Sequence, residues 1–143
     1  MFYLINFIVC VDDRMGVAFN RRLLSRDKYI DGYLEELSES GRVVADNNYI
    51  KYIDNENYEN SENISEEELR DNEENINIFC SSKDTLSYSK IADRVTVFFW
   101  NRRYPSDVQF DYDYVRNNFQ LQKHEDDIEG STHSLTMEIW IRK

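Results

Sequence analysis

The chain has 143 residues, 41% of them hydrophobic, which is enough for one globular domain around a single core without a disulfide. Its formal net charge of -11 argues against nucleic-acid binding, because such binding depends on Lys and Arg side chains that neutralise phosphates. We therefore expect one domain over residues 1–143 with a solubilising acidic surface, although that surface could also attract a basic partner.

The chain begins with an apolar run from Met1 to Val11, which Asp12 and Asp13 end. The run lacks a basic leader and is too short to cross a bilayer, so it predicts a buried strand in a cytoplasmic protein without membrane contact. Because a reducing compartment disfavours disulfides, Cys10 and Cys80 are interpreted as small core residues.

An irregular loop, Val17 to Leu24, is expected next. A helix is predicted to begin at Ser25, whose hydroxyl can cap free backbone N–H groups, with Asp27 favourably placed in the first turn. Gly41 is expected to stop this helix, and Arg42 to Ala45 follow as a strand. The apolar face of the helix consists of Ile30, Tyr33, Leu34 and Leu37.

The segment from Asp54 to Glu74 is rich in Asn and Glu and follows a short helix or turn predicted over Asn47 to Ile53. A capping box that starts at Ser65 predicts a short helix from Glu66 to Asp71 within this otherwise loose, acidic excursion. The excursion is the part of the chain least able to build core, because it has few sizeable apolar residues. They are Tyr58, Ile64 and Leu69.

The remainder predicts a strand over Ile76 to Cys80 and a helix over Asp84 to Ala92. The continuous apolar run from Val95 to Trp100 is typical of a central strand covered on both faces. Alternation over Phe119 to Lys123 and over Leu135 to Ile141 predicts two antiparallel strands. This order predicts an α/β domain whose mostly parallel sheet carries a C-terminal antiparallel strand and flanking helices.

Short motifs within this order of elements resemble those of the dihydrofolate reductases. Gly16 lies where that family has the glycine of its active-site loop, and Asp27 lies where it keeps its substrate-binding carboxylate. Asp107 in S-D-V-Q-F-D resembles the acid of the family's G-D-T-x-F-P segment, and Ser131 to Ser134 resemble its final S-H turn. The resemblance implies a dihydrofolate reductase-like sandwich, NADPH as cofactor and a pterin-like substrate. It extends over residues 1–45 and 75–143.

Most cofactor motifs of that family are replaced in this chain. In that family a pair of glycines lies against the cofactor pyrophosphate. This chain has Cys80-Ser81-Ser82 at that place, and their side chains would crowd a backbone that has to approach phosphate closely. The G-R-x-T phosphate signature becomes Asp46 to Tyr49, which puts a carboxylate where an anion would bind. Phe98 stands where the family's Thr hydrogen-bonds its acid. We therefore expect no cofactor, and NADPH only if the chain is a true reductase.

Two arginine motifs and one aspartate form the candidate ligand-binding site. In a reductase-like fold both motifs lie at the C-terminal edge of the sheet, where their guanidinium groups can hold a carboxylate or phosphate. They could equally neutralise neighbouring carboxylates, and the aspartate could bind an amidine-like heterocycle or only complement the helix dipole. The candidate residues are Asn20, Arg21, Arg22, Asp27, Asn101 and Arg102. The neighbouring carboxylates are Asp12, Asp13, Asp107 and Asp111.

Other catalytic chemistry has little support in the sequence. His124 and His133 are the only histidines, so no ligand set for a transition metal is expected. A nucleophile pair of His133 with either cysteine stays open, although thiols in apolar strands are usually inert. Asp111 and Asp113 lack the glycine and glutamate of an EF-hand, so they predict a solvated loop.

The sequence therefore favours a non-catalytic small-molecule or protein-binding module on a degenerate dihydrofolate reductase-like scaffold. One alternative is an oxidoreductase, in which NADPH reduces a pterin-like heterocycle oriented by Asp27. Another is an acidic protein-interaction module that acts through the excursion at residues 54–74.

Overall fold

The computed structural model describes residues 3–20, 22–53, 56–71, 73–79 and 85–143. Its larger sheet contains β1 (Ile5–Val11), β4 (Arg42–Ala45), β5 (Glu59–Asn60), β6 (Ile76–Phe79), β7 (Arg94–Phe99), β9 (Phe119–Glu129) and β10 (Ser134–Arg142). Its smaller sheet contains β2 (Gly16–Phe19), β3 (Arg22–Leu23) and β8 (Val108–Gln109). The helices are α1 (Lys28–Ser38), α2 (Asn47–Ile50), α3 (Glu66–Arg70), α4 (Thr85–Ile91), α5 (Tyr112–Asn118) and a 3-10 helix, Ser61–Asn63.

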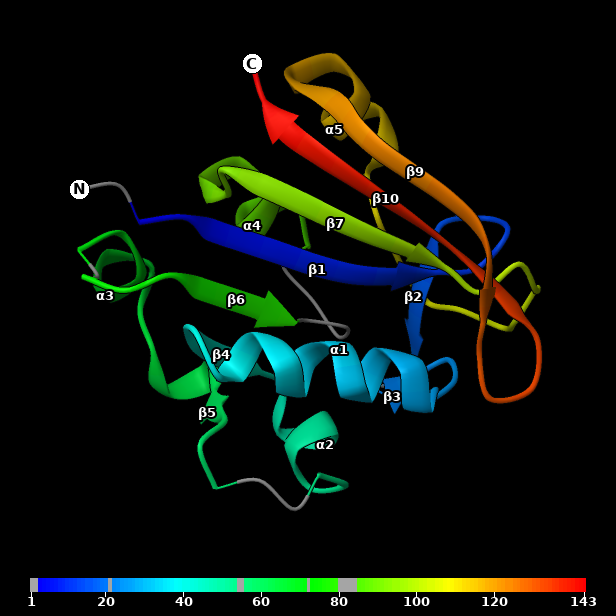
Figure 1. Cartoon of the computed structure of the whole chain (residues 1–143), viewed down its shortest axis with the longest axis horizontal. Helices are drawn as coiled ribbons and strands as arrows, with labels where there is room; N and C mark the ends of the chain where they lie inside the picture. The colour runs from blue at the N-terminus through cyan, green and yellow to red at the C-terminus, as the bar shows by residue number, and fades with distance from the viewer. Residues whose placement is uncertain (1–2, 21, 54–55, 72, 80–84) are drawn as a thin grey trace.

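The larger sheet is seven-stranded, in the order β5-β4-β6-β1-β7-β10-β9. β1 pairs in parallel with both β6 and β7, whereas β10 is antiparallel to β7 and to β9. Helix α1 covers one face of this sheet, and α4 and α5 cover the other (Figure 1). This arrangement confirms the predicted α/β fold with a mostly parallel sheet and antiparallel C-terminal strands.

The predicted central strand is β7, which lies between β1 and β10. Val95 and Val97 project into the core on the side of α4 and α5, while Phe98 projects toward α1. All three side chains are fully buried, which explains why this strand has a continuous apolar sequence rather than an alternating one.

The prediction of an irregular loop over residues 17–24 is wrong. Gly16–Phe19 and Arg22–Leu23 form an antiparallel pair, and the first of these strands also pairs with Val108–Gln109. The strands are very short and one partner lies far away in the chain, so no local pattern marks them. Arg21 lies outside the described residues.

The first helix begins at Lys28, not at Ser25 as predicted. Asp27 is its N-cap, with extended backbone (φ -144°), and its carboxylate accepts a hydrogen bond from the Tyr29 N–H at 2.8 Å. The helix ends at Ser38, before Gly41. A Cβ atom at Gly41 would lie 2.8 Å from the Asn75 carbonyl oxygen, so this glycine permits a close approach between two segments of the chain rather than ending the helix.

The acidic excursion contributes more to the core than its composition predicted. Glu59–Asn60 add an edge strand to the sheet, where Glu59 forms a 2.7 Å ion pair with Arg42. Tyr58 and Leu69 are buried, with exposed fractions of 7% and 3%. The predicted capping box is confirmed, because the Ser65 hydroxyl accepts the Glu68 N–H at the start of α3.

Residues 111–113 form the start of helix α5, not the predicted solvated loop. Asp111 caps this helix by accepting the Tyr114 N–H at 3.0 Å, and Asp113 in the first turn pairs with Arg116. A carboxylate at each of these positions stabilises the N-terminus of a helix, which is why the D-x-D pattern occurs here.

The predicted strand from Ile76 and helix up to Ala92 are confirmed for their described parts, which end at Phe79 and resume at Thr85. Cys10 is buried and free, as expected of a core residue, whereas Cys80 lies outside the described residues. In the part of the chain that the structure describes, no helix is long and apolar enough to cross a membrane.

Asp27 connects helix α1 to the turn between β9 and β10. Its carboxylate is 3% exposed; Oδ1 accepts the Tyr29 N–H, and Oδ2 accepts the Ser131 N–H at 2.7 Å. The Ser131 hydroxyl in turn accepts the Lys28 N–H at 2.8 Å. Gly130 makes the approach possible, since a Cβ atom there would lie 2.6 Å from Asp27 Oδ2. Both carboxylate oxygens of Asp27 therefore accept hydrogen bonds from backbone N–H groups.

We expect Asp27→Asn to lower the free energy of unfolding by about 1–3 kcal/mol, because one buried N–H loses its charged acceptor. Urea unfolding followed by circular dichroism measures this change. Asp13→Asn is the control, because Asp13 is exposed and its loss should change stability by less than about 0.5 kcal/mol. Equal stability of the two variants would contradict the structural role of Asp27.

A second buried carboxylate, Glu138, joins α5 to the two C-terminal strands. Its Oε1 accepts the Tyr112 hydroxyl at 2.5 Å and the Trp140 N–H at 3.1 Å, and its Oε2 lies 2.8 Å from His124 Nδ1. The other ring nitrogen of His124 lies 3.1 Å from Asp126. The hydrogen bonds to Glu138 and then to Asp126 raise the pKa of His124 above its usual value.

This raised pKa predicts a loss of stability with rising pH. Stabilisation by protonated His124 is fully present below its unfolded pKa of about 6.5 and disappears as pH rises through the higher folded value. The urea midpoint of the wild type should therefore fall over that window, by a small amount because the ring is largely exposed. In His124→Gln this part of the fall should be absent, because the variant lacks the imidazole. An unchanged pH profile in the variant would contradict the prediction.

Candidate functional site

Two clefts flank the loop at residues 101–105, which follows β7 at the carboxyl ends of the parallel strands. The first, here called the hairpin cleft, has a volume of about 510 Å³ and is lined by Asn101, Arg102, Arg103, His133 and Ser134. The second, the loop cleft, has a volume of about 490 Å³ and is lined by Phe19, Asn20, Arg22, Leu23, Leu24, Tyr104 and Pro105. Ligands of open α/β sheets bind at this edge.

Asn101 fixes the start of this loop against the neighbouring strand. Its backbone adopts the left-handed conformation (φ 58°), which asparagine tolerates better than most residues. Its side-chain amide donates to the Thr136 hydroxyl at 3.0 Å and to the Ser134 carbonyl at 3.3 Å. Asn101 is therefore held by β10, and it positions the arginines that follow it.

Asp12 holds the loop from the other side. This carboxylate is 1% exposed; one oxygen accepts the N–H groups of Arg14 and Gly16, and the other accepts the Tyr104 N–H at 3.0 Å. A Cβ atom at Gly16 would collide with the Ser106 side chain, so glycine is required here for packing against the loop. The backbone that carries Arg102 and Arg103 is thus fixed at both ends.

The arginines of the clefts have exposed guanidinium groups without carboxylate partners. Among the described residues, Arg22, Arg102 and Arg103 form no ion pair. The basic residues that do form ion pairs are Arg26, Arg42, Arg70, Arg116, Lys123 and His124. The carboxylates expected to neutralise the arginines bind backbone N–H groups instead, as they do at Asp12, Asp107 and Asp111.

Two buried ring nitrogens beside the hairpin cleft have no hydrogen-bond partner in the described part of the structure. They are Nε1 of Trp100, a residue that is 1% exposed, and Nε2 of His133, which lines the cleft. The two rings are neighbours, with centroids 6.5 Å apart. Buried polar atoms are nearly always paired, so these nitrogens indicate a place where a further polar atom is needed.

The structure divides the residues predicted for the site into three groups. Asn20 and Arg22 line the loop cleft, and Asn101 and Arg102 line the hairpin cleft. Asp27 lines neither cleft, and its two carboxylate oxygens accept the Tyr29 and Ser131 N–H groups. Arg21 lies outside the described residues. The structure adds Arg103, Tyr104, His133 and Ser134, of which the first was visible as the last member of the N-R-R motif.

The space beside helix α1 is filled by aromatic rings. Phe98 is fully buried, and its ring meets Tyr33 and Tyr29 edge-on with centroids 5.2 and 6.3 Å away. A phenyl ring cannot donate the hydrogen bond that a threonine would. Asp46, which replaces part of the phosphate signature, is buried at the start of α2. Cys80-Ser81-Ser82 lie outside the described residues.

Two further groups bear on catalysis. Burial, and then the electrostatic effect of Asp27, raises the pKa of the Cys10 thiol, so this cysteine stays protonated and is not an activated nucleophile. No group of three or more His, Cys, Asp or Glu residues among those described is arranged to hold a metal ion.

Comparison with known proteins identifies the fold. No protein-family model matches the chain, and no curated protein matches it. A solved structure of dihydrofolate reductase from Enterococcus faecalis, complexed with NADP(H) and RAB-propyl, is similar with a TM-score of 0.69. The match covers 98% of this chain and 96% of that chain, at 10% sequence identity. With the strand order and helix layers described above, it shows that this chain has a dihydrofolate reductase-like fold.

Proposed function

We propose that this chain is a non-catalytic binding module that holds a small anionic molecule, through its carboxylate or phosphate groups, at the hairpin and loop clefts. The observation that carries the proposal is that Arg22, Arg102 and Arg103 lie in these clefts without a carboxylate partner among the described residues, in a protein of net charge -11. Arginine binds carboxylate and phosphate in a planar, bidentate manner, and it keeps its charge at every physiological pH.

The surroundings of the hairpin cleft support an anionic ligand. Its polar groups include two guanidinium groups, a histidine and a serine hydroxyl, and none of the described residues that line it is acidic. The indole N–H of Trp100 and Nε2 of His133 lack partners among the described residues; an oxygen of an anion would accept from the indole, and a water held by the anion would pair with either nitrogen. Because the loop backbone is fixed by Asn101 and Asp12, the arginines lose less freedom when they bind.

Binding is favoured over hydride transfer by the residues around Asp27. The carboxylate that the resemblance assigns to the substrate accepts hydrogen bonds from the Tyr29 and Ser131 N–H groups, and the buried Phe98 ring packs against Tyr29 and Tyr33 of α1. Asp46 places a buried carboxylate at the start of α2, where an anionic cofactor would be repelled. No cofactor is therefore part of the proposed function.

The first test is isothermal titration of the wild-type chain with citrate and with pyrophosphate. Arg102→Gln and Arg103→Gln should each weaken binding about tenfold, because each removes a charge-assisted contact worth about 1.5 kcal/mol. Arg116→Gln is the matched control, since it removes the same charge from an exposed site on α5. Equal weakening by all three variants, or no binding by the wild type, would reject the proposed site.

The alternative is an NADPH-dependent reductase of a pterin-like heterocycle. This alternative is supported by the fold, which the chain shares with a dihydrofolate reductase complexed with NADP(H). Under our proposal, NADPH should raise the melting temperature no more than pyrophosphate does, and Arg102→Gln should reduce that rise, because it weakens binding about tenfold. Dihydrofolate should not oxidise NADPH when absorbance is followed. A ligand that binds only the folded state at about 100 times its Kd stabilises by about 2.7 kcal/mol. A rise of that size that persists in Arg102→Gln, together with NADPH oxidation, would establish the reductase.

A further inference from the structure

A groove of about 260 Å³ is lined by residues of α3 and α4 and by Ile64. These two helices lie near the amino ends of the parallel strands (Figure 1), and the two arginine clefts lie at the carboxyl ends. The groove is lined by Ile64, Glu66, Leu69, Ser87, Tyr88 and Ile91. Its volume is below the roughly 300–1,000 Å³ of typical small-molecule pockets, and it matches the size of one large side chain better.

The floor of this groove is apolar and rests on the core. Leu69 is 3% exposed, and the Tyr88 ring packs against Phe7 with centroids 5.7 Å apart. Ile64 and Ile91 are half-buried, and Leu86 on the same helix α4 is 38% exposed. An apolar floor with polar residues at its rim is the usual composition of a protein-binding surface.

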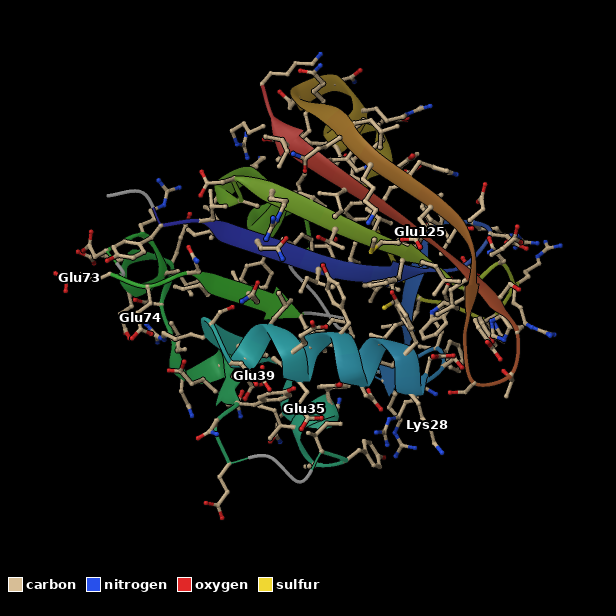
Figure 2. All side chains as sticks on the ribbon, viewed as in Figure 1. Lys28, Glu35, Glu39, Glu73, Glu74 and Glu125 are labelled. Atoms are coloured by element: carbon tan, nitrogen blue, oxygen red, sulfur yellow. The ribbon has the colours of Figure 1, made fainter. Side chains whose placement is uncertain are left out.

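One wall of the groove belongs to an acidic segment: Glu66 lines the groove, and Glu67 and Glu68 follow it on α3. Residues 54–74 contain ten Asp or Glu and a single basic residue, Arg70, so this excursion carries most of the net charge of -11. Glu59 and Glu66 have ion-pair partners in Arg42 and Arg70, whereas Glu62, Glu67 and Glu68 are exposed. Figure 2 shows Glu73 and Glu74 extending outward at the same end of the molecule. A cationic partner would be attracted toward the groove over about a Debye length.

We propose that the groove between α3 and α4 binds a basic segment of a partner protein, which inserts one large apolar side chain between Leu69 and Tyr88. A second copy of this chain would bring the same excess of carboxylates and is disfavoured by repulsion, as is nucleic acid. Lys and Arg that flank the inserted side chain would face the glutamates of the rim. This surface is separate from the arginine clefts and does not depend on the function proposed for them.

The test uses the full chain, labelled with ¹⁵N, and a synthetic peptide of Lys and Ser residues with one central Trp. A matched peptide has Ser in place of the Trp. The Trp peptide should perturb the amide resonances of Ile64, Leu69, Tyr88 and Ile91, and it should bind at least about tenfold more tightly than the Ser peptide, because the apolar contact supplies that difference. Equal affinity of the two peptides, or perturbations confined to other residues, would overturn the proposal.

Charge reversal provides the second arm. Glu66 and Ser87 are exposed residues of the groove. The variants Glu66→Lys and Ser87→Arg should each lower the affinity for the Trp peptide by about tenfold. Glu35→Lys is the matched control for Glu66→Lys, because Glu35 is exposed on α1 (Figure 2) and both changes reverse one charge. It should change the affinity less than about twofold. If Glu35→Lys weakens binding as much as Glu66→Lys, the attraction is non-specific and the groove is not the site.

Discussion

Burial of β1 and β7 on both faces is the constraint from which the rest of the structure follows. The side chains of Phe7, Ile8, Val95 and Phe98 have no exposed surface, so helices must cover the sheet on both sides. Parallel pairing of these two strands then brings their carboxyl ends to one edge and their amino ends to the other. The arginine clefts lie at the first edge and the groove between α3 and α4 at the second. The positions of both candidate surfaces therefore depend on the pairing of two apolar strands.

Three buried carboxylates hold the connections around this sheet. Asp12 binds the loop after β7, Asp27 binds the turn between β9 and β10, and Glu138 binds the start of α5. Each accepts hydrogen bonds at both oxygens, as a buried charge must if it is to be tolerated. In this chain Asp27 has a full set of structural partners, although the resemblance to the reductases assigns the same position to substrate. A carboxylate at the same position of the same fold can have a different role, because its role depends on the groups that it contacts.

Charge is distributed unevenly over the molecule. Excess carboxylates are concentrated in residues 54–74, whereas Arg22, Arg102 and Arg103 gather at the far edge without ion-pair partners among the described residues. Exposed ion pairs such as Arg70–Glu66 contribute little to stability. The cleft arginines lie at the carboxyl ends of the parallel strands, whereas α3, which carries Glu66, Glu67 and Glu68, lies near their amino ends.

The sequence by itself determined the elements with strong local signals. Four local patterns were sufficient to predict their elements, because each depends on neighbours within a few residues. They are the apolar runs of β1 and β7, the alternation in β10 and the capping box of α3. Tertiary structure decided what depends on distant partners. The pairing of β2 with β8, the burial of Tyr58 and Leu69 and the contact of Asp27 with Ser131 all join segments far apart in the chain. The arginine clefts belong to this second group: the N-R-R motif was visible in the sequence, but His133 and Ser134 reach Arg102 only because β10 lies beside β7.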